Sequence, residues 1–300
     1  MNISIIGASG FVGKNLINYL LENTDYKISA IAPHANDIVV LTNYKKRIKL
    51  VNANVLNYRQ MKEALVKTDV CFYFVHMLDH KGDFHKEENE AAEMAGMLLR
   101  EVKAKRIIYL GGLGADTDSL SKHLLSRHET GEILRKYVTP VIEFRASMVI
   151  GAGSASYEIV RDVVRRSPII LIPGAGATKT QPINVQDVME YLCAAIKLPT
   201  KESIIVEIGS DEVLSYEDFI KKYKKFKGSK IPVIRVPFLP SVVAGYFLNF
   251  FTTRKRARIG QNMLKSFENE MVVTNTNALK FFPEIKTHPI EEIFLTTNKQ

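Results

Sequence analysis

Three glycines near the start of the chain form a pattern that is typical of a phosphate-binding turn. Gly7, Gly10 and Gly13 stand in GASGFVG, directly after the apolar run from Ile3 to Ile6. In such a turn the first glycine permits a tight bend, the second lets the backbone approach a pyrophosphate, and the third lets helix and strand pack closely. The helix that follows offers unpaired N–H groups and a partial positive charge to the phosphates. The sequence therefore predicts a dinucleotide-binding loop.

The segments around this loop alternate between strand and helix patterns. Short β-branched or aromatic runs follow at residues 28–32, 48–51, 70–75, 106–110 and 141–144. Helical patterns lie between most of them, most clearly at 84–102, where Ala91, Ala95 and Leu98 line one face and Glu88 falls elsewhere. Unbroken apolar strands that alternate with helices predict an α/β fold, a Rossmann-type doubly wound parallel sheet with helices on both faces.

The composition of the chain changes after about residue 150. Gly and Pro become frequent in GAGSAS, SPIILIPGAGATKTQP and IPVIRVPFLP, which predicts loops and short strands. Ser215 stands three residues before Asp218 and predicts a capped helix start in this region. We therefore expect an NAD(P)-binding core at residues 1–150 and a smaller substrate or partner lobe at 151–300, partly integrated with the core.

The composition limits the class of protein. With 300 residues, 46% hydrophobic and 24% charged, the chain is excluded from the disordered, collagen-like and low-complexity classes. The net charge of +9 favours anionic partners without choosing among them. The basic residues are scattered and match no reading motif, so no nucleic-acid partner is expected. Cys71 and Cys193 lie in apolar runs and the start of the chain shows no signal-peptide pattern, which together predict a cytoplasmic location.

A long apolar run followed by a basic cluster lies late in the chain. Residues 236–251 are apolar but include Pro237 and Pro240, and about 20 residues are needed to cross a bilayer as a helix. The basic stretch TTRKRAR follows directly. Residues 236–258 therefore have two interpretations, peripheral contact with an anionic membrane or a core element followed by a solvated helix start.

The end of the second predicted strand should decide between NAD and NADP, because an acidic residue there holds a ribose hydroxyl and a basic one meets a 2'-phosphate. The sequence reads APHA at this point, and the first carboxylate is that of Asp37. His34 and the cluster at 45–47, KKR, offer positive charge. NADP is therefore favoured over NAD, although the cluster is equally well interpreted as a solvated loop.

Four stretches together resemble the extended and atypical branches of the short-chain dehydrogenase/reductase superfamily. They are GASGFVG, IIYLGGLG, FRASMVIGAG and QPINVQDVMEYL, and they extend over roughly residues 1–210. Within that superfamily the chain most resembles the atypical NAD(P)H-binding proteins, close to the NmrA-like regulators and the accessory subunit of respiratory complex I. YFVHML and LLSRHETGEIL are similar to a bacterial subgroup with epimerase or oxidoreductase activity.

Two functions follow from this resemblance. It implies an NAD(P)-binding oxidoreductase-like protein, a reductase or an epimerase that acts on a small substrate held against the later lobe. The alternative is a non-catalytic NADPH-binding redox sensor or assembly factor that acts through a protein partner. The implied cofactor contacts are Gly7, Ser9, Gly10, Phe11, Val12, Gly13, His34, Asn54, Val55, Val75, His76 and Arg127. Asn54 matches an aspartate that commonly accepts from the adenine amino group.

The residues that usually transfer the proton in this superfamily are missing. Catalytic members use Ser or Thr after the fifth strand and a Tyr-x-x-x-Lys pair on the next helix, where the lysine lowers the pKa of the phenol. Here the fifth strand runs into GGLG, and the matching helix positions hold His123 and Arg127. Histidine exchanges a proton near neutral pH, whereas arginine only orients or neutralises. Both are candidate catalytic residues, the alternative being polar residues beside the cofactor without a catalytic role.

Two further patterns are interpreted as carrying no chemistry. The Tyr-x-x-x-Lys strings at 58–62 and 223–227 fall outside that helix and are interpreted as chance matches on solvated faces. His76, Asp79, His80 and His85 match no standard ligand spacing, so no metal is expected.

Overall fold

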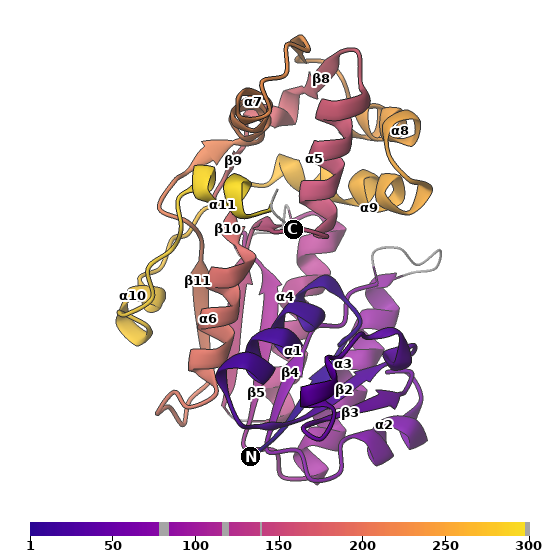
Figure 1. Ribbon diagram of the computed structural model, residues 1–300, viewed down its shortest axis with the longest axis vertical. Coiled ribbons are helices and arrows are strands. Elements are labelled where there is room, and N and C mark those ends of the chain that lie inside the picture. The colour runs from indigo at the N-terminus through magenta and orange to yellow at the C-terminus, as the bar shows by residue number, and fades with distance from the viewer. Residues whose placement is uncertain (78–83, 116–119, 139, 298–300) are drawn as a thin grey trace.

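A parallel sheet at the centre of the molecule confirms the predicted α/β class. The computed structural model describes residues 1–77, 84–115, 120–138 and 140–297. The strands of the main sheet are β1 (Asn2–Ile6), β2 (Lys27–Ala32), β3 (Ile48–Asn52), β4 (Val70–Tyr73), β5 (Arg106–Gly112), β6 (Val141–Ala146) and β11 (Ile204–Ile208). Within the described residues they form one seven-stranded sheet in the order β11-β6-β5-β4-β1-β2-β3, with every pairing parallel (Figure 1). The strand order turns back between β1 and β4, which is the place where doubly wound sheets bind ligands.

Helices cover both faces of the sheet, as the alternating patterns predicted. One face carries α1 (Phe11–Asn23) and α6 (Val185–Ala195), which bury Leu16 and Leu192 in a shared core. The other carries α2 (Tyr58–Ala64), α3 (Phe84–Glu101) and α4 (Lys122–Tyr137), which bury Ala95 and Leu134. The short 3₁₀ helices η1 (Ala35–Asp37) and η2 (Thr42–Tyr44) connect β2 to β3. Strands covered on both faces are largely apolar, which explains the apolar runs in the sequence.

The later part of the chain builds a smaller lobe over the carboxyl edge of the sheet (Figure 1). Its elements are β7 (Val149–Ile150), α5 (Ala155–Arg166), β8 (Ile170–Pro173), η3 (Gly174–Ala177), β9 (Lys179–Thr180), β10 (Ile183–Asn184), β12 (Leu214–Ser215), α7 (Tyr216–Phe226), β13 (Val233–Val236), α8 (Ser241–Phe251), α9 (Arg254–Leu264), η4 (Lys265–Glu268) and α11 (Ile290–Thr297). A further helix, α10 (Asn277–Phe281), lies beside β11. Because α6 and β11 also lie beyond residue 150, the chain leaves the core, returns to it and enters the lobe again.

The lobe has a core of its own, built largely from aromatic rings. Tyr157, Phe219, Tyr223 and Phe294 are all fully buried, and their rings meet edge to face. Helix α7 begins as predicted, since the Ser215 hydroxyl accepts the N–H of Asp218 at 3.0 Å. None of the helices in the described part of the chain is both long and apolar enough to cross a membrane.

A buried charge cluster joins β6 to α4. The Glu143 carboxylate is fully buried, accepts from Arg145 Nε at 2.7 Å and also pairs with Arg135. Gly131 of α4 lies directly against this carboxylate, and a Cβ added there would come within 2.2 Å of Glu143 Oε2. The carboxylate has little freedom to move, because leaving its arginines would strand a buried charge.

We expect Gly131→Ala to destabilise the protein by about 2 kcal/mol or more, because overpacking at a fixed group outweighs the helix preference for alanine, roughly 1 kcal/mol. Urea unfolding measures the change in free energy. Gly114→Ala is the matched control, since its new methyl would meet only leucine side chains at 3.4 and 3.5 Å. Equal stability of the two variants would contradict the packing described for Glu143.

Candidate functional site

The glycine loop between β1 and α1 has the geometry that its sequence predicted. Gly7 has a positive φ of 83°, and a Cβ there would lie 2.7 Å from the Phe74 carbonyl oxygen. A Cβ at Gly13 would lie 2.6 Å from the Gly7 carbonyl oxygen. At Gly10 the nearest atom would be 3.3 Å away. The fold thus requires glycine at the first and third positions, whereas Gly10 leaves its open side to a ligand.

The first turn of α1 is suited to an anion. Gly10 is the N-cap and supplies no side-chain hydrogen bond, and the first turn holds no acidic residue. The N–H groups at a helix start then keep their capacity to bind phosphate oxygens, aided by the helix dipole. The residues present therefore fit a dinucleotide, with its pyrophosphate held by the loop and this helix start.

A cleft extends from the glycine loop to the ends of β4, β5 and β6. It has a volume of about 390 Å³ and is lined by His123 and by seven of the predicted cofactor residues, Gly7, Gly10, Phe11, Val12, Gly13, His76 and Arg127. Sequence reasoning missed other residues of the lining, among them Ser147, Ser154, Ser156, Lys255 and Met263. Lys255 belongs to α9 and comes from the basic stretch that is far from the loop along the chain. No local pattern could have revealed this placement, because it depends on how the lobe packs.

Arg127 joins two strand ends at the floor of the cleft. Its guanidinium donates to the carbonyl oxygen of Val75 at 3.0 Å and to that of Leu110, and it lies 4.9 Å from the centre of the Tyr109 ring. The Tyr109 hydroxyl in turn donates to the Arg127 carbonyl oxygen at 2.8 Å. Arg127 is 7% exposed, so its role is to hold the strand ends and to place a positive charge beside the cleft.

The two histidines of the cleft form a chain of hydrogen bonds. The Nε2 atoms of His76 and His123 are 3.1 Å apart, and the Glu88 carboxylate lies 2.9 Å from His76 Nδ1. Glu88 also accepts the Met77 N–H at 2.7 Å and the Ser126 hydroxyl. With Nδ1–H of His76 donated to Glu88, its Nε2 accepts the Nε2–H of His123 when both rings are neutral.

The prediction that Glu88 falls outside the buried face of its helix was wrong. Its side chain is 2% exposed, because the three donors named above replace the water that a buried carboxylate would lose. Burial alone would raise the pKa of Glu88, but the hydrogen bond and charge of His76, followed by Arg127 and Ser126, lower it to about 2. The stabilisation from this ionised carboxylate is therefore present above about pH 4.5 and is lost as the pH falls toward about 2.

His123 has a different electrostatic environment. Burial first, and then the charges of His76 and Arg127, lower its pKa well below the usual range, against the opposing effect of Glu88. His123 is therefore neutral near pH 7, and its Nδ1 lies 3.0 Å from the Ser266 hydroxyl of η4. An additional proton on the pair would be stabilised on His76, because the Glu88 carboxylate contacts that ring.

The structure separates the other candidate motifs from the cleft. Tyr58 and Lys62 are exposed on α2, where Lys62 Nζ lies 3.4 Å from the Tyr58 hydroxyl. The solvated-face interpretation was wrong for Tyr223, which is fully buried and whose hydroxyl lies 3.4 Å from that of Tyr157. Asp79 and His80 lie outside the described residues, and among those described no three His, Cys, Asp or Glu side chains gather as a metal site would require.

Comparisons with known proteins agree with this site. Residues 7–197 match the family model described as NAD(P)H-binding, and the match begins at the first glycine of the loop. The chain belongs to this NAD(P)H-binding family. No curated protein was found with a similar sequence. The family assignment confirms the predicted dinucleotide cofactor, and solved structures confirm the fold that the resemblance to the short-chain dehydrogenase/reductase superfamily implied.

Solved structures of similar fold cover the whole chain. The triphenylmethane reductase of Citrobacter sp., complexed with NADP(H), aligns with a TM-score of 0.77 at 14% identity over 99% of this chain and 100% of its own. The UDP-glucose 4-epimerase of Thermotoga maritima, with UDP-glucose, aligns with a TM-score of 0.73 at 14% identity over 100% of this chain and 98% of its own. A Bordetella bronchiseptica enzyme in complex with NAD+ aligns with a TM-score of 0.72 at 10% identity over 99% of this chain and 97% of its own. Core and lobe therefore share one known architecture.

The residues predicted to contact the adenosine part of the NAD(P)H lie at the ends of β2 and β3, outside the lining of the cleft. His34 is exposed after β2. Asn54 is exposed, and its side-chain oxygen accepts the N–H of Leu56 at 3.0 Å, which leaves one lone pair for another donor. Val55 and Val75 are buried, and Ser9 is partly exposed in the glycine loop. None of these placements prevents the predicted contacts.

The basic cluster at 45–47 lies at the edge of the sheet where β1 and β2 begin, opposite the edge that carries the cleft. Arg47 donates to the carbonyl oxygens of Leu21 at 2.9 Å and Thr24, and so caps the end of α1. Lys46 and Arg47 line a depression with Asn2 and Lys27, where β1 and β2 begin. The solvated-loop interpretation therefore fits Lys45 and Lys46, and of the residues proposed to meet a 2'-phosphate His34 is the one that remains at the end of β2.

We expect His34→Asp to lower the ratio of NADPH affinity to NADH affinity by about tenfold, close to 1.4 kcal/mol, because a carboxylate repels the 2'-phosphate and accepts from a ribose hydroxyl. Calorimetric titration with each nucleotide measures the ratio. Asp37→Asn removes a nearby exposed carboxylate and should change the ratio less. An unchanged ratio in His34→Asp would remove His34 from the cofactor site.

Proposed function

We propose that the protein is an NAD(P)H-dependent reductase whose small substrate carries an apolar group. The observation that carries the proposal is an apolar chamber of about 110 Å³ in the lobe, formed by α5, β8, η3, α7, α8, α9 and η4. Met148, Ser156 and Met263 line both this chamber and the cofactor cleft. A cavity of roughly 150 Å³ holds benzene, so this smaller chamber accommodates a compact alkyl group, and an aromatic ring would extend from it into the adjoining cleft.

The lining of the chamber favours this substrate over a sugar nucleotide. Its walls are almost entirely aliphatic and aromatic, including Ile159, Val163, Ile172, Phe219 and Leu248. Sugar hydroxyls buried there would lose their hydrogen bonds to water without gaining others. The epimerase and the reductase reported above share the fold, and the apolar chamber supports the reductase. It also favours an enzyme over a redox sensor, because a sensor needs no second cavity open to its cofactor.

The side chains of the cleft supply the proton that a reduction requires. A bound nicotinamide supplies the hydride. His76 in its charged form donates the Nε2 proton to the substrate oxygen, and Glu88 stabilises that charge before transfer. While His76 is charged and no substrate is bound, neutral His123 accepts the Nε2–H of His76. This hydrogen bond keeps the His76 ring oriented. Arg127 places a fixed positive charge beside the cleft, which favours negative charge that develops on the substrate.

The experiment compares NADPH oxidation with small aromatic aldehydes, short branched ketones and quinones against oxidation with UDP-sugars. We expect turnover with apolar acceptors only. Ser156→Phe, which fills the junction of cleft and chamber, should lower kcat/KM for such acceptors at least about tenfold. Arg165→Phe places the same ring on the exposed face of α5 and should leave the rate unchanged. Binding of NADPH without turnover of any acceptor would contradict the proposal.

A further inference from the structure

The hydrogen-bond chain of the cleft continues beyond His123. Nδ1 of His123 lies 3.0 Å from the hydroxyl oxygen of Ser266, and that oxygen lies 3.0 Å from the hydroxyl oxygen of Ser121. Ser121 is the N-cap of α4 and also accepts the N–H of Leu124 at 3.3 Å. The chain of hydrogen bonds therefore extends from His76 in the cleft to the start of α4.

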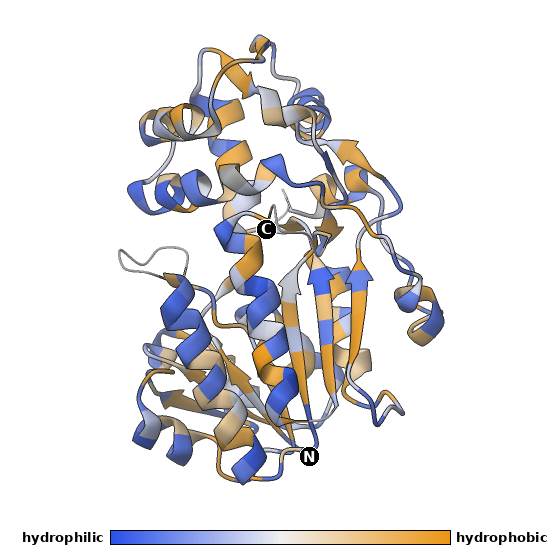
Figure 2. Cartoon of the chain, turned by 180° about the vertical axis from the view of Figure 1, so that it is seen from behind, coloured by the Kyte–Doolittle hydropathy of each residue, from blue (hydrophilic) through white to orange (hydrophobic). Residues whose placement is uncertain are grey.

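This extension passes through the contact between core and lobe. The strands of the sheet point toward the lobe (Figure 2), and α4, which follows β5, meets η4 of the lobe there. Ser121 and Ser266 do not belong to the lining of the cleft. Ser266 is 3% exposed, and Ser121 is partly exposed. The chain thus leaves the cleft through residues that cofactor and substrate would not cover, and it ends at a residue that water contacts.

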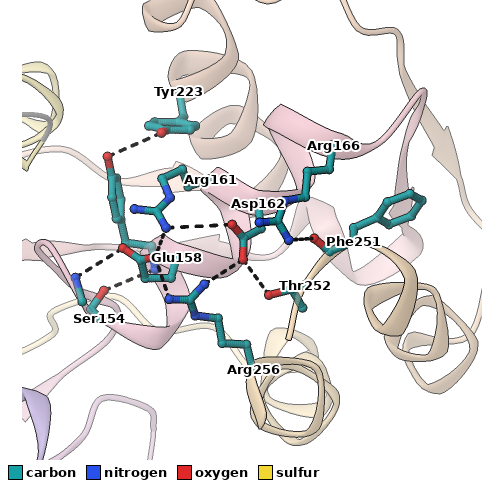
Figure 3. Close-up of polar contacts among 11 residues, drawn as sticks. Ser154, Glu158, Arg161, Asp162, Arg166, Tyr223, Phe251, Thr252 and Arg256 are labelled. Atoms are coloured by element: carbon teal, nitrogen blue, oxygen red, sulfur yellow. Dashed lines mark hydrogen bonds and ion pairs between the residues drawn. The ribbon is translucent and has the colours of Figure 1, made fainter. Parts of the chain in front are cut away.

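The fold holds Ser266 from both sides along the chain. Helix η4 continues α9, and Arg256 of α9 pairs with the buried carboxylate of Asp162 on α5 at 2.9 Å (Figure 3). After η4, the side-chain oxygen of Asn269 accepts the N–H of Ser121 at 3.0 Å. The position of the Ser266 hydroxyl is therefore fixed before any ligand binds.

With both histidines neutral, the donors of the chain all point toward His76. The Nε2–H of His123 donates to His76, which leaves Nδ1 of His123 as an acceptor. The Ser266 hydroxyl has one proton, so it donates to this Nδ1 and accepts from the Ser121 hydroxyl. Each of these polar atoms then has a hydrogen-bond partner.

An additional proton on His76 reverses every donor in the chain. The Nε2–H of His76 then donates to Nε2 of His123, whose own proton lies on Nδ1 and is accepted by Ser266. Ser266 in turn donates to Ser121, whose proton is directed to water. Hydroxyl groups both donate and accept, so the hydrogen bonds persist in both states. Without a hydroxyl at position 266, the charged state would leave the Nδ1–H of His123 without an acceptor.

We propose that Ser121 and Ser266 form the route by which His76, as the proton donor of the reductase proposed above, regains its proton while cofactor and substrate occupy the cleft. Solvent gives a proton to Ser121, which passes its own hydroxyl proton to Ser266. Ser266 passes its proton to Nδ1 of His123, and His123 passes its Nε2 proton to His76. One proton leaves the solvent and one reaches His76, and only N–H and O–H bonds form and break. Ser266 is a positioning residue, because it acts through His123.

Ser266→Val and Ser266→Thr are a matched pair, since their side chains have nearly the same shape and only threonine keeps a hydroxyl. NMR titration of His76 in the protein alone, with its resonances assigned through His76→Gln, tests the chain without any turnover. We expect valine to lower the proton affinity of His76 about tenfold, because the charged state loses a charge-assisted hydrogen bond. Threonine should keep it within about twofold. Glu88 and Arg127, the charged groups beside the two rings among the described residues, are unchanged in both variants.

The dependence of kcat on pH is the second readout. Above the midpoint of the His76 titration, most complexes with cofactor and substrate form with neutral His76 and need the chain to obtain a proton. There kcat of Ser266→Val should be at least about tenfold below that of Ser266→Thr, and the two should converge at low pH, where His76 is charged before the ligands bind.

Equal titration midpoints in the two variants would overturn the proposal, whether or not the protein reduces any acceptor. A loss of kcat in Ser266→Val that is the same at every pH would overturn it too, because it would indicate a packing role. If no acceptor is reduced, the proposed reductase fails and the titration alone decides whether the chain of hydrogen bonds exists.

Discussion

Gly10→Val should lower the affinity for NADPH at least about 100-fold, because a side chain there occupies the space through which the backbone approaches the pyrophosphate. A Cβ at Gly10 would lie 3.3 Å from the Gly7 carbonyl oxygen, so the loop has to shift by a few tenths of an ångström, and the thermal unfolding midpoint should fall by only a few degrees, roughly the effect of 1 kcal/mol or less. Calorimetric titration measures the affinity, and differential scanning calorimetry measures stability.

Two comparisons make this result specific. Asn18→Val adds the same side chain at an exposed position on α1 and should leave NADPH affinity within about twofold. Gly13→Val, in contrast, should also destabilise the fold, because its Cβ would lie 2.6 Å from the Gly7 carbonyl oxygen. Unchanged NADPH binding by Gly10→Val would place the pyrophosphate somewhere other than the glycine loop.

His76→Gln should reduce the rate of acceptor reduction by about 100-fold or more, the usual contribution of a general acid, and leave NADPH affinity within about threefold. Glutamine retains a donor toward Glu88 but cannot supply a proton from a charged ring. Steady-state kinetics with saturating NADPH measures the loss, which should appear in kcat.

His123→Gln separates proton donation from positioning. Because His123 is neutral near pH 7 and contacts the substrate's proton donor through Nε2, its loss should reduce the rate by about tenfold, less than the loss of His76. The pH profile of the remaining activity should shift, because the ring that His123 orients would lose a hydrogen-bond partner. The proton path would be wrong if His123→Gln cost more than His76→Gln, or if both variants kept the wild-type rate.

The sequence predicted the parts of the site that depend on local geometry. Gly7, Gly10 and Gly13 act within a single turn, and the spacing of His123 and Arg127 on one helix already placed them on one side. Strand and helix patterns likewise reflect burial on both faces of the sheet. These features depend on neighbours a few residues away, so periodicity and turn chemistry were sufficient.

Other parts could not be predicted, because they depend on contacts between distant segments. Glu88 follows the pattern of a solvated residue on α3 and becomes buried only because His76 and Ser126 supply donors from other elements. Lys255 lines the cofactor cleft because α9, which Arg256 ties to Glu158 and Asp162 of α5, packs against the cleft. The apolar chamber is enclosed by Met148 and by residues from five further stretches, 156–163, 170–176, 216–220, 244–248 and 260–267, and no single stretch indicates it.

The central claim is hydride transfer from the cofactor to an acceptor held in the apolar chamber. The most direct measurement uses NADPH with deuterium at both C4 positions of the nicotinamide, an apolar aldehyde or ketone from the panel, and mass spectrometry of the alcohol product. We predict one deuterium on the reduced carbon of the product, and a loss of labelled product in Ser156→Phe that Arg165→Phe does not show. An unlabelled product, or no product from protein that binds NADPH, would contradict the claim.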